Sequence, residues 1–182
     1  MDLVFVAHRD NIAELPQYMD LVAELGVKKV SVSNLLTFRE NLQSKTLYGL
    51  TEDPKVRAIF QEAKIKAHRH GIELGLPRLT PRAMGCTQSE FIFVDIDGNV
   101  APCDFLAVHT PFYYMGEKRV VRPVIFGNAL TGDLAKIWNS KAARSFRKSH
   151  REGEIPNPCS HCIDAYGMMC SRRELDRHRG AE

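Results

Sequence analysis

The sequence C-T-Q-S-E-F-I-F-V-D-I-D-G-N-V-A-P-C, residues 86–103, decides how this chain is organised. Aromatic and β-branched residues dominate residues 91–96, which predicts a strand. Asp97-Gly98 follows, and Asp-Gly between two apolar runs is a strong indication of a hairpin turn. The short apolar run after the turn ends at a proline, where a strand should stop. The predicted hairpin therefore brings Cys86 and Cys103, one at each end, towards each other.

A second pair of thiols lies far downstream, in Cys159-Ser160-His161-Cys162. Two thiol pairs from distant segments predict a four-thiolate metal site, which suits either zinc or an iron–sulfur cluster. The 16 residues between Cys86 and Cys103 favour a cluster, because a compact zinc ribbon has C-x₂-C at both ends. His161 is expected to lie exposed or behind the ligands rather than to be one. Cys170 is either a spare core cysteine or an alternative ligand.

The composition describes a globular protein of modest charge. With 182 residues, 44% of them hydrophobic, the chain can bury the core of one or two domains. A net charge of +3 gives no reason to expect a nucleic-acid partner. Basic residues crowd into residues 144–150 and 172–179, which are interpreted as solvated helical faces rather than as phosphate-binding patches.

The cysteines are expected to be metal ligands of a cytoplasmic protein. No apolar run is long enough to span a membrane, and no secretory signal is recognisable. In the cytosol, clustered cysteines bind metals more often than they form disulfides. Five is also an odd number, which fits a disulfide framework poorly. A disulfide-stabilised secreted domain is therefore set aside.

The first 76 residues predict a parallel α/β sheet. Strands are expected at residues 3–7, 29–33 and 72–76, and helices between them. Asn11 with Glu14 resembles a capping box, although Pro16 indicates a later start of the regular helix. Asp53-Pro54 predicts the start of the second helix. In this β-α-β-α-β order the strand ends carry the functional groups, here residues 8–11, 33–34 and 77–78.

Three strands do not close a barrel, so the sheet is predicted to have an open edge. Such an edge tends to pair with another chain. We expect self-association through this region, or coverage of the edge by residues 37–52 or 104–122.

After Cys103 the pattern is weaker. Residues 104–122 are interpreted as a loop in which Pro111-Phe112-Tyr113-Tyr114 forms a satellite hydrophobic cluster rather than a stacking site for substrate. A short strand is expected at residues 124–128. Two helices should follow, the first opened by Asp133 and the second capped by Ser140. Trp138 is expected in the core.

Three blocks of sequence resemble a known family. They are C-x₁₁-G-x₄-C (Cys86, Gly98, Cys103), F-G-N-A-L-T-G-D-L-A-K-I-W-N-S-K-A-A-R-S-F-R at 126–147, and P-C-S-H-C at 158–162. In this order they are similar to the SPASM/twitch auxiliary-cluster domain of radical SAM enzymes. Residues 1–82 resemble the C-terminal half of the partial barrel of these enzymes. The resemblance implies an α/β fold, with a segment of a partial (βα) barrel at 1–82 and a small α+β domain with a β-hairpin and helices at 83–182.

The resemblance implies a cofactor and a ligand set. One [4Fe–4S] cluster would be held by Cys86, Cys103, Cys159 and Cys162, as in the shorter twitch pattern. Only C-x₂-C-x₇-C, ending at Cys170, is left of the longer pattern, so a second complete cluster is not implied. The C-x₃-C-x₂-C motif that binds the S-adenosylmethionine-cleaving cluster is absent from the chain. The chain alone is therefore not expected to cleave S-adenosylmethionine.

The resemblance also implies partners. Asn11 and Asn34 lie at predicted strand ends and are candidate contacts to cofactor or substrate, although strand-end asparagines more often cap helices. The chain is expected to be a piece of a longer protein or one half of a split enzyme. Its family resemblance is to members that modify a tungsten cofactor and to members that modify peptides, so a peptide or a cofactor precursor is the expected substrate.

Two functions therefore compete. The first is an iron–sulfur auxiliary portion of a radical SAM enzyme, which supports electron transfer or positions substrate. The second is a non-catalytic interaction module with a structural zinc site. The two differ in metal and sulfide content.

Overall fold

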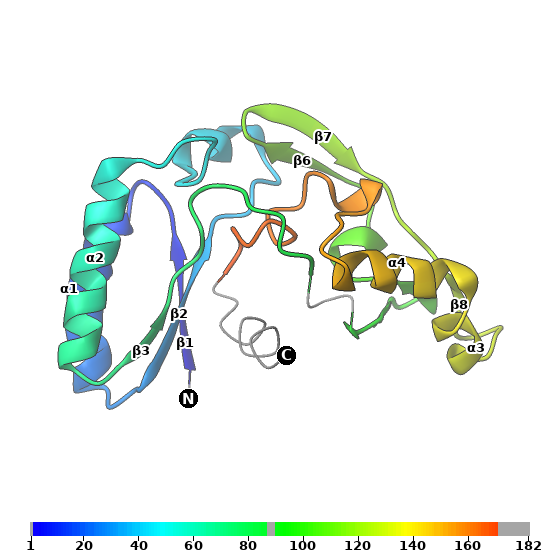
Figure 1. The fold of residues 1–182 in the computed structure, drawn as a ribbon, viewed down its shortest axis with the longest axis horizontal. Helices are drawn as coiled ribbons and strands as arrows, with labels where there is room; N and C mark the ends of the chain where they lie inside the picture. The colour runs from blue at the N-terminus through cyan, green and yellow to red at the C-terminus, as the bar shows by residue number, and fades with distance from the viewer. Residues whose placement is uncertain (1, 87–89, 171–182) are drawn as a thin grey trace. The chain divides into compact units, whose positions relative to one another are not determined.

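The structure is a computed structural model that describes residues 2–86 and 90–170 (Figure 1). The chain divides into two compact units, one formed by Met1–Arg82 with Gly167–Glu182 and the other by Ala83–Tyr166. The division of the chain into a barrel segment and a SPASM/twitch domain at residue 82 stays a prediction. The basic run at 172–179 lies outside the described residues.

The first unit is built on a three-stranded parallel sheet in the order β1-β2-β3. Its strands are β1 (Asp2–Ala7), β2 (Lys29–Asn34) and β3 (Glu73–Gly75). Both strand pairs are parallel, with Asp2 opposite Lys29 and Lys29 opposite Glu73. The predicted parallel α/β arrangement is confirmed. That the sheet is part of a barrel remains a prediction.

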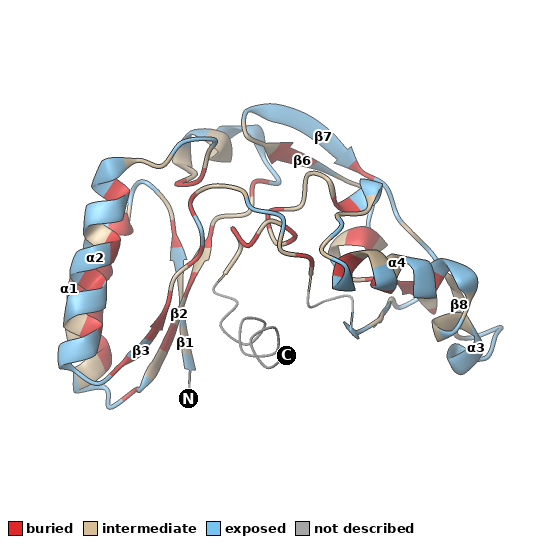
Figure 2. Cartoon of the chain, in the orientation of Figure 1, coloured by how far each residue is buried: buried red, intermediate tan, exposed pale blue. Residues whose placement is uncertain are grey.

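Two helices, α1 (Leu15–Glu24) and α2 (Pro54–Arg69), pack side by side against one face of this sheet (Figure 1). Their buried sides turn towards the strands (Figure 2). Together with the strands they form one hydrophobic core, whose fully or almost fully buried members include Ala7, Leu15, Met19, Val22, Val30, Val32, Ala63 and Leu74.

The starts of the two helices test the predicted caps. Asp53 accepts a hydrogen bond from the Lys55 N–H at 3.0 Å, so its role as the cap of α2 is confirmed. The capping box at Asn11 is wrong, because a 3₁₀ turn at Ile12–Glu14 precedes α1 and the Asn11 side chain makes no cap bond. The Asn11 side-chain amide instead forms hydrogen bonds with Val6 and His8, across the loop after β1. The later start indicated by Pro16 is confirmed.

The second unit contains the predicted hairpin. It consists of β4 (Phe93–Val94) and β5 (Asn99–Ala101), and β8 (Gly127–Asn128) pairs with the other side of β5. Both pairs are antiparallel. The expected strand at 91–96 is shorter, because Asp95 already accepts hydrogen bonds from the N–H groups of residues 97 and 99 and turns the chain. The turn therefore takes four residues.

Residues 104–122 do not form a loop, and this expectation is wrong. They begin with a 3₁₀ turn (Phe105–Ala107) and continue as an antiparallel hairpin of β6 (Thr110–Tyr114) and β7 (Glu117–Val121). The connection is Met115-Gly116, and both residues have positive φ. Phe112 is buried and packs against Phe105 with a ring distance of 5.2 Å, so the aromatic residues do gather in a hydrophobic cluster.

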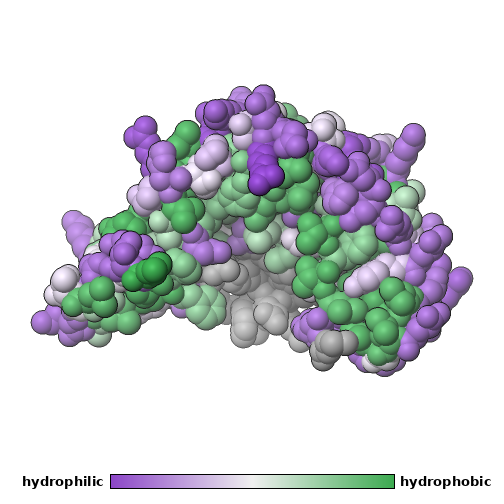
Figure 3. Space-filling view, turned by 180° about the vertical axis from the view of Figure 1, so that it is seen from behind, coloured by the Kyte–Doolittle hydropathy of each residue, from purple (hydrophilic) through white to green (hydrophobic). Residues whose placement is uncertain are grey.

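The two helices expected in the second half are present. Asp133 caps α3 (Leu134–Trp138), and Ser140 caps α4 (Lys141–Arg151). Several apolar side chains of the second unit stay exposed, among them Ile96, Leu130 and Leu134. Figure 3 shows apolar residues in green on the surface.

The basic helix α4 departs from its interpretation as a solvated face. Arg147 and His150 are buried, with 7% and 2% of their surface exposed. Trp138 is only partly buried, so its expected place in the core is wrong. The Arg147 guanidinium covers one face of its ring. Among the described residues, no helix has the length and apolar character that crossing a membrane requires.

Candidate metal centre

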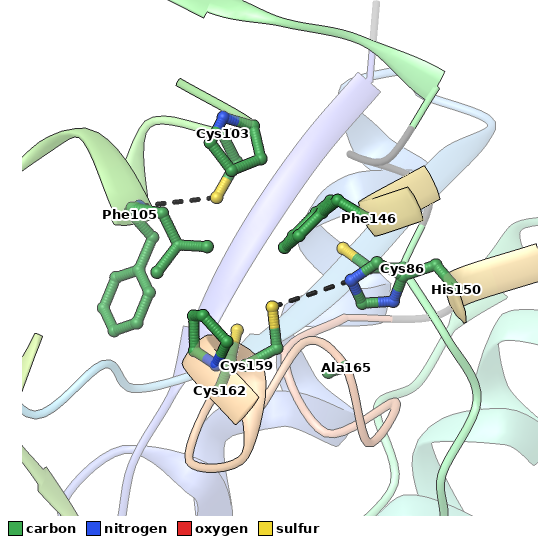
Figure 4. A pocket seen from close by; sticks show the side chains of 11 residues that line it. Cys86, Cys103, Phe105, Phe146, His150, Cys159, Cys162 and Ala165 are labelled. Atoms are coloured by element: carbon green, nitrogen blue, oxygen red, sulfur yellow. Dashed lines mark hydrogen bonds between the residues drawn. The ribbon is translucent and has the colours of Figure 1, made fainter. Parts of the chain in front are cut away.

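One pocket of the second unit is lined by four of the five cysteines. The sulfur atoms of Cys86, Cys103, Cys159 and Cys162 lie around this pocket (Figure 4). The other lining residues are mostly apolar and comprise Pro102, Phe105, Leu106, Phe146, His150, Pro158 and Ala165. The structure thus brings the four cysteines of the predicted site together.

Cys103 is placed by the end of the hairpin. β5 stops at Ala101, and Pro102 carries the chain out of the sheet into the 3₁₀ turn that Asp104 caps. This turn directs the Leu106 N–H at the Cys103 sulfur, at 3.4 Å. A backbone N–H aimed at a sulfur stabilises negative charge on it, as a metal-bound thiolate requires.

Cys159 and Cys162 lie on consecutive turns. The 3₁₀ turn Asn157–Cys159 is followed by hydrogen bonds from the Cys162 N–H to the Cys159 carbonyl and from the Ala165 N–H to the Cys162 carbonyl, at 3.0 and 3.1 Å. The Met84 N–H donates to the Ala165 carbonyl at 3.0 Å. This last bond holds the segment that carries Cys86 beside the C-x₂-C turns.

Helix α4 adds a histidine that the sequence analysis did not assign to the site. His150 Nε2 lies 3.6 Å from Cys159 Sγ, and the imidazole packs against Phe146 with a ring distance of 4.9 Å. Phe146 and His150 are four residues apart and share one helix face. The burial of Ala143, one turn before Arg147 and two before His150, continues that face. This spacing on a capped helix was the available indication that His150 points inward.

Burial sets the protonation state of two of the thiols, Cys103 and Cys159. It is the main cause that raises the pKa of Cys103 to about 11, and the charge of Cys162 raises it further. Burial likewise raises the pKa of Cys159, and the charges of Cys162 and Cys103 add to this effect. These thiols are therefore neutral at pH 7 in the metal-free protein. Because metals bind thiolates, binding must release these protons.

Two side chains close to the cysteines, Asp164 and His161, form contacts of their own. The Cys86 thiol donates to the Asp164 carboxylate at 3.0 Å. His161 Nδ1 lies 2.9 Å from the Ser160 hydroxyl, and its ring meets Tyr114 edge-on at 5.7 Å. Burial lowers the pKa of His161, which is not among the residues that line the pocket.

Among the described residues, no group of three His, Cys, Asp or Glu side chains is arranged to chelate one metal ion.

The remaining candidate residues lie in the first unit. Cys170 forms an antiparallel β-bridge with Ser33. Asn34 is 1% exposed, and its Nδ2 donates to the carbonyls of Arg78 and Met168 at 3.1 and 2.6 Å. Asn34 thus ties the chain around Met168 to the end of β2.

Asn11 has a similar local role. Its Nδ2 donates to the Val6 carbonyl, and its Oδ1 accepts from the His8 N–H, both at 2.9 Å. These bonds explain why asparagines stand at the two strand ends. A contact of Asn11 or Asn34 with a cofactor stays a prediction.

Comparisons with known proteins agree with the chemistry of the pocket. Residues 86–163 match SPASM, an iron–sulfur cluster-binding domain. This match begins at Cys86 and includes all four cysteines of the pocket. The predicted resemblance to the SPASM domain and the expected class of cofactor are confirmed.

Two curated proteins match most of the chain. The tungsten-containing aldehyde ferredoxin oxidoreductase cofactor-modifying protein of Pyrococcus furiosus is 29% identical over 161 residues, which are 86% of this chain and 44% of that protein. The PqqA peptide cyclase of Gluconobacter oxydans is 25% identical over 171 residues, 89% of this chain and 43% of that protein. The chain thus spans less than half the length of these relatives. No solved structure gave a significant match.

Proposed function

We propose that this chain is the auxiliary-cluster portion of a radical SAM modification enzyme. Cys86, Cys103, Cys159 and Cys162 would hold one [4Fe–4S] cluster. The observation that carries the proposal is the pocket that all four of these cysteines line. It lies in the region that matches the iron–sulfur cluster-binding domain.

The match to an iron–sulfur cluster-binding domain favours a cluster over a single zinc ion. The four cysteines alone do not separate the two, because a tetrahedral zinc ion also takes four thiolates. A structural zinc site remains the alternative outcome of the experiment below.

The residues present suit such a group. When bound, the cluster would supply a site that accepts and passes on one electron. The chain's own residues would bind it and keep water away, since Pro102, Leu106 and Phe146 line the pocket. The Leu106 N–H would stabilise the charge on the Cys103 sulfur.

The substrate follows from the relatives only as a proposal. One relative is named for modifying a cofactor and the other for cyclising a peptide. We therefore propose a peptide or a cofactor precursor as the substrate of the complete enzyme. This portion would position the substrate or accept an electron from it. Without a C-x₃-C-x₂-C motif, this chain would not cleave S-adenosylmethionine by itself.

Metal analysis of the anaerobically purified and reconstituted chain tests the proposal. We expect about four iron and four sulfide per chain, together with the electron paramagnetic resonance signal of a reduced [4Fe–4S] cluster. Cys159→Ser should lose most of the iron and sulfide. Cys170→Ser is the matched control and should keep both. A colourless chain with one zinc, or loss of the cluster in Cys170→Ser, would contradict the proposed ligand set.

A further inference from the structure

Two polar side chains outside the four cysteines contact sulfurs of the pocket. His150 Nε2 lies 3.6 Å from Cys159 Sγ, and Asp164 Oδ2 lies 3.0 Å from Cys86 Sγ. The two groups differ in electrical character. An imidazole offers an N–H donor, whereas an ionised carboxylate offers only negative charge.

The position of His150 is fixed by its surroundings. It is 2% exposed, it projects from α4 into the pocket, and its ring packs against Phe146 (Figure 4). Cys159 is buried as well, with 6% of its surface exposed. Because the neighbouring wall is apolar, water does not screen the contact between Nε2 and the sulfur, and its electrostatic effect is larger than at a surface.

The Asp164 carboxylate has the opposite electrostatic effect on the sulfur that it contacts. In the metal-free protein the Cys86 thiol donates its hydrogen to the carboxylate. If Cys86 held iron as a thiolate, it would have lost that hydrogen, and the carboxylate would face a negatively charged sulfur.

We propose, on the basis of the cluster assigned above, that His150 and Asp164 set its reduction potential in opposite directions. Reduction adds one electron from an external donor, and no covalent bond forms or breaks. The added negative charge spreads over the sulfurs, whose hydrogen bonds and neighbouring charges tune the potential. The His150 N–H stabilises the reduced form and raises the potential. The Asp164 carboxylate destabilises it and lowers the potential.

A redox titration of the cluster-loaded full chain tests this inference. Dithionite supplies the electron, and the signal of the reduced cluster is followed by electron paramagnetic resonance. His150→Phe keeps the packing on Phe146 but removes the donor. We expect it to shift the potential downwards by about 59 mV, a tenfold change in the ratio of reduced to oxidised cluster. Asp164→Asn should shift the potential upwards, and His150→Gln, which keeps an N–H donor, should stay closer to the wild type.

Two controls separate this effect from general disturbance. His161→Gln changes a histidine between two ligands that does not line the pocket. Asp97→Asn removes the same charge at an exposed position of the hairpin turn. Both should leave the potential unchanged.

The inference fails if His150→Phe leaves the potential unchanged or raises it, or if Asp164→Asn does not raise it. Should His150→Phe not fold, His150→Leu replaces it, and the sign of the Asp164→Asn shift decides in either case. Iron and sulfide are measured in every sample. A wild-type chain without the cluster contradicts the proposed function, whereas a normally loaded chain with unshifted variants contradicts only the roles of His150 and Asp164.

Discussion

The buried arginine of α4 connects two helices of the second unit through one side chain. Arg147 Nη1 donates to the Trp138 carbonyl at 2.9 Å, and its guanidinium lies 3.6 Å from the centre of the Trp138 ring. The carbonyl is near the C-terminus of α3, where a cation is favoured. The residue therefore fixes α3 against α4, the helix that carries His150.

Arg147→Met tests this connection. The variant keeps most of the apolar stem and loses both polar interactions, so we expect the free energy of unfolding to fall by about 2 kcal/mol. Arg144→Met on the exposed side of the same helix is the matched control and should change little. Urea denaturation followed by circular dichroism measures both. Equal stabilities of the two variants would show that the Arg147 contacts contribute nothing.

Asp95 gives the hairpin a dependence on pH. Hydrogen bonds from the Asn99 side chain, and then from the N–H groups of Asn99 and Asp97, lower the pKa of its carboxyl group below the usual value. A lowered folded pKa stabilises the protein above the unfolded value of about 3.9. This contribution is lost as the pH falls through the unfolded and then the folded pKa.

Asp95→Asn should therefore be less stable than the wild type at pH 7, and the difference should shrink as the pH falls below about 4. Denaturation curves between pH 3 and pH 7 measure it. Asp97→Asn, at an exposed position in the same turn, is the control and should run parallel to the wild type. A difference between Asp95→Asn and wild type that is constant with pH would refute the role of the carboxylate.

At the level of elements, the β4–β5 turn depends on a glycine for two separate reasons. Gly98 has a φ of +79°, and a Cβ there would lie 2.5 Å from Leu130 Cγ and 3.0 Å from Asn128 Oδ1. Gly153, after α4, has a φ of +76° but nothing within 4 Å of its Cβ position. A Cβ at Gly98 would therefore introduce both backbone strain and a clash, whereas a Cβ at Gly153 would introduce backbone strain alone.

The pair gives a matched experiment. We expect Gly153→Ala to cost about 1 kcal/mol of unfolding free energy and Gly98→Ala about 3 kcal/mol. Since the hairpin leads into Cys103, Gly98→Ala should also lower the amount of iron bound on reconstitution. Thermal unfolding and iron analysis of the two variants provide the comparison. Similar costs for both substitutions would mean that Leu130 moves aside without penalty.

Elements with local determinants could be predicted from the sequence. Asp53-Pro54, Asp133 and Ser140 each supply a cap within three residues of the helix they start, so the sequence alone identified these helices. The hairpin was recognisable from Asp97-Gly98, although its four-residue turn depends on the bonds of Asp95. The four thiols could be grouped because two pairs at a distance are typical of thiolate sites.

Elements whose determinants are distant in sequence could not be predicted in this way. The β6–β7 hairpin turns at Met115-Gly116, and a methionine at positive φ is not a usual turn residue. Its second strand begins Glu117-Lys118-Arg119, which lacks apolar alternation because those side chains are exposed. His150 looked like part of a basic surface run. Its spacing from Ala143 indicates the buried face of α4, but its contact with Cys159 joins segments that local patterns do not connect.

At the scale of the whole molecule, the first unit's sheet has two outer strands, β1 and β3, each of which pairs with one neighbour only within the described ranges. Within the described ranges, β1 pairs with β2 alone. Val4 and Val6 lie on this edge strand and are 63% and 47% exposed. Their side chains point to the face of the sheet opposite the core residue Ala7, since successive residues of a strand alternate. A strand edge with apolar residues beside it tends to pair with another chain.

We predict that a second copy of this chain covers the edge when the chain is alone in solution, in a two-fold dimer. Light scattering of the reduced, cluster-loaded protein should give about twice the chain mass of 20.6 kDa. Val4→Lys with Val6→Lys should restore the monomer, because charged side chains beside an edge oppose pairing. Leu21→Lys with Ile65→Lys is the matched control, since these residues are 48% and 53% exposed on α1 and α2. It should remain a dimer. A wild-type mass near 20.6 kDa over a wide range of concentration would rule out self-association through β1.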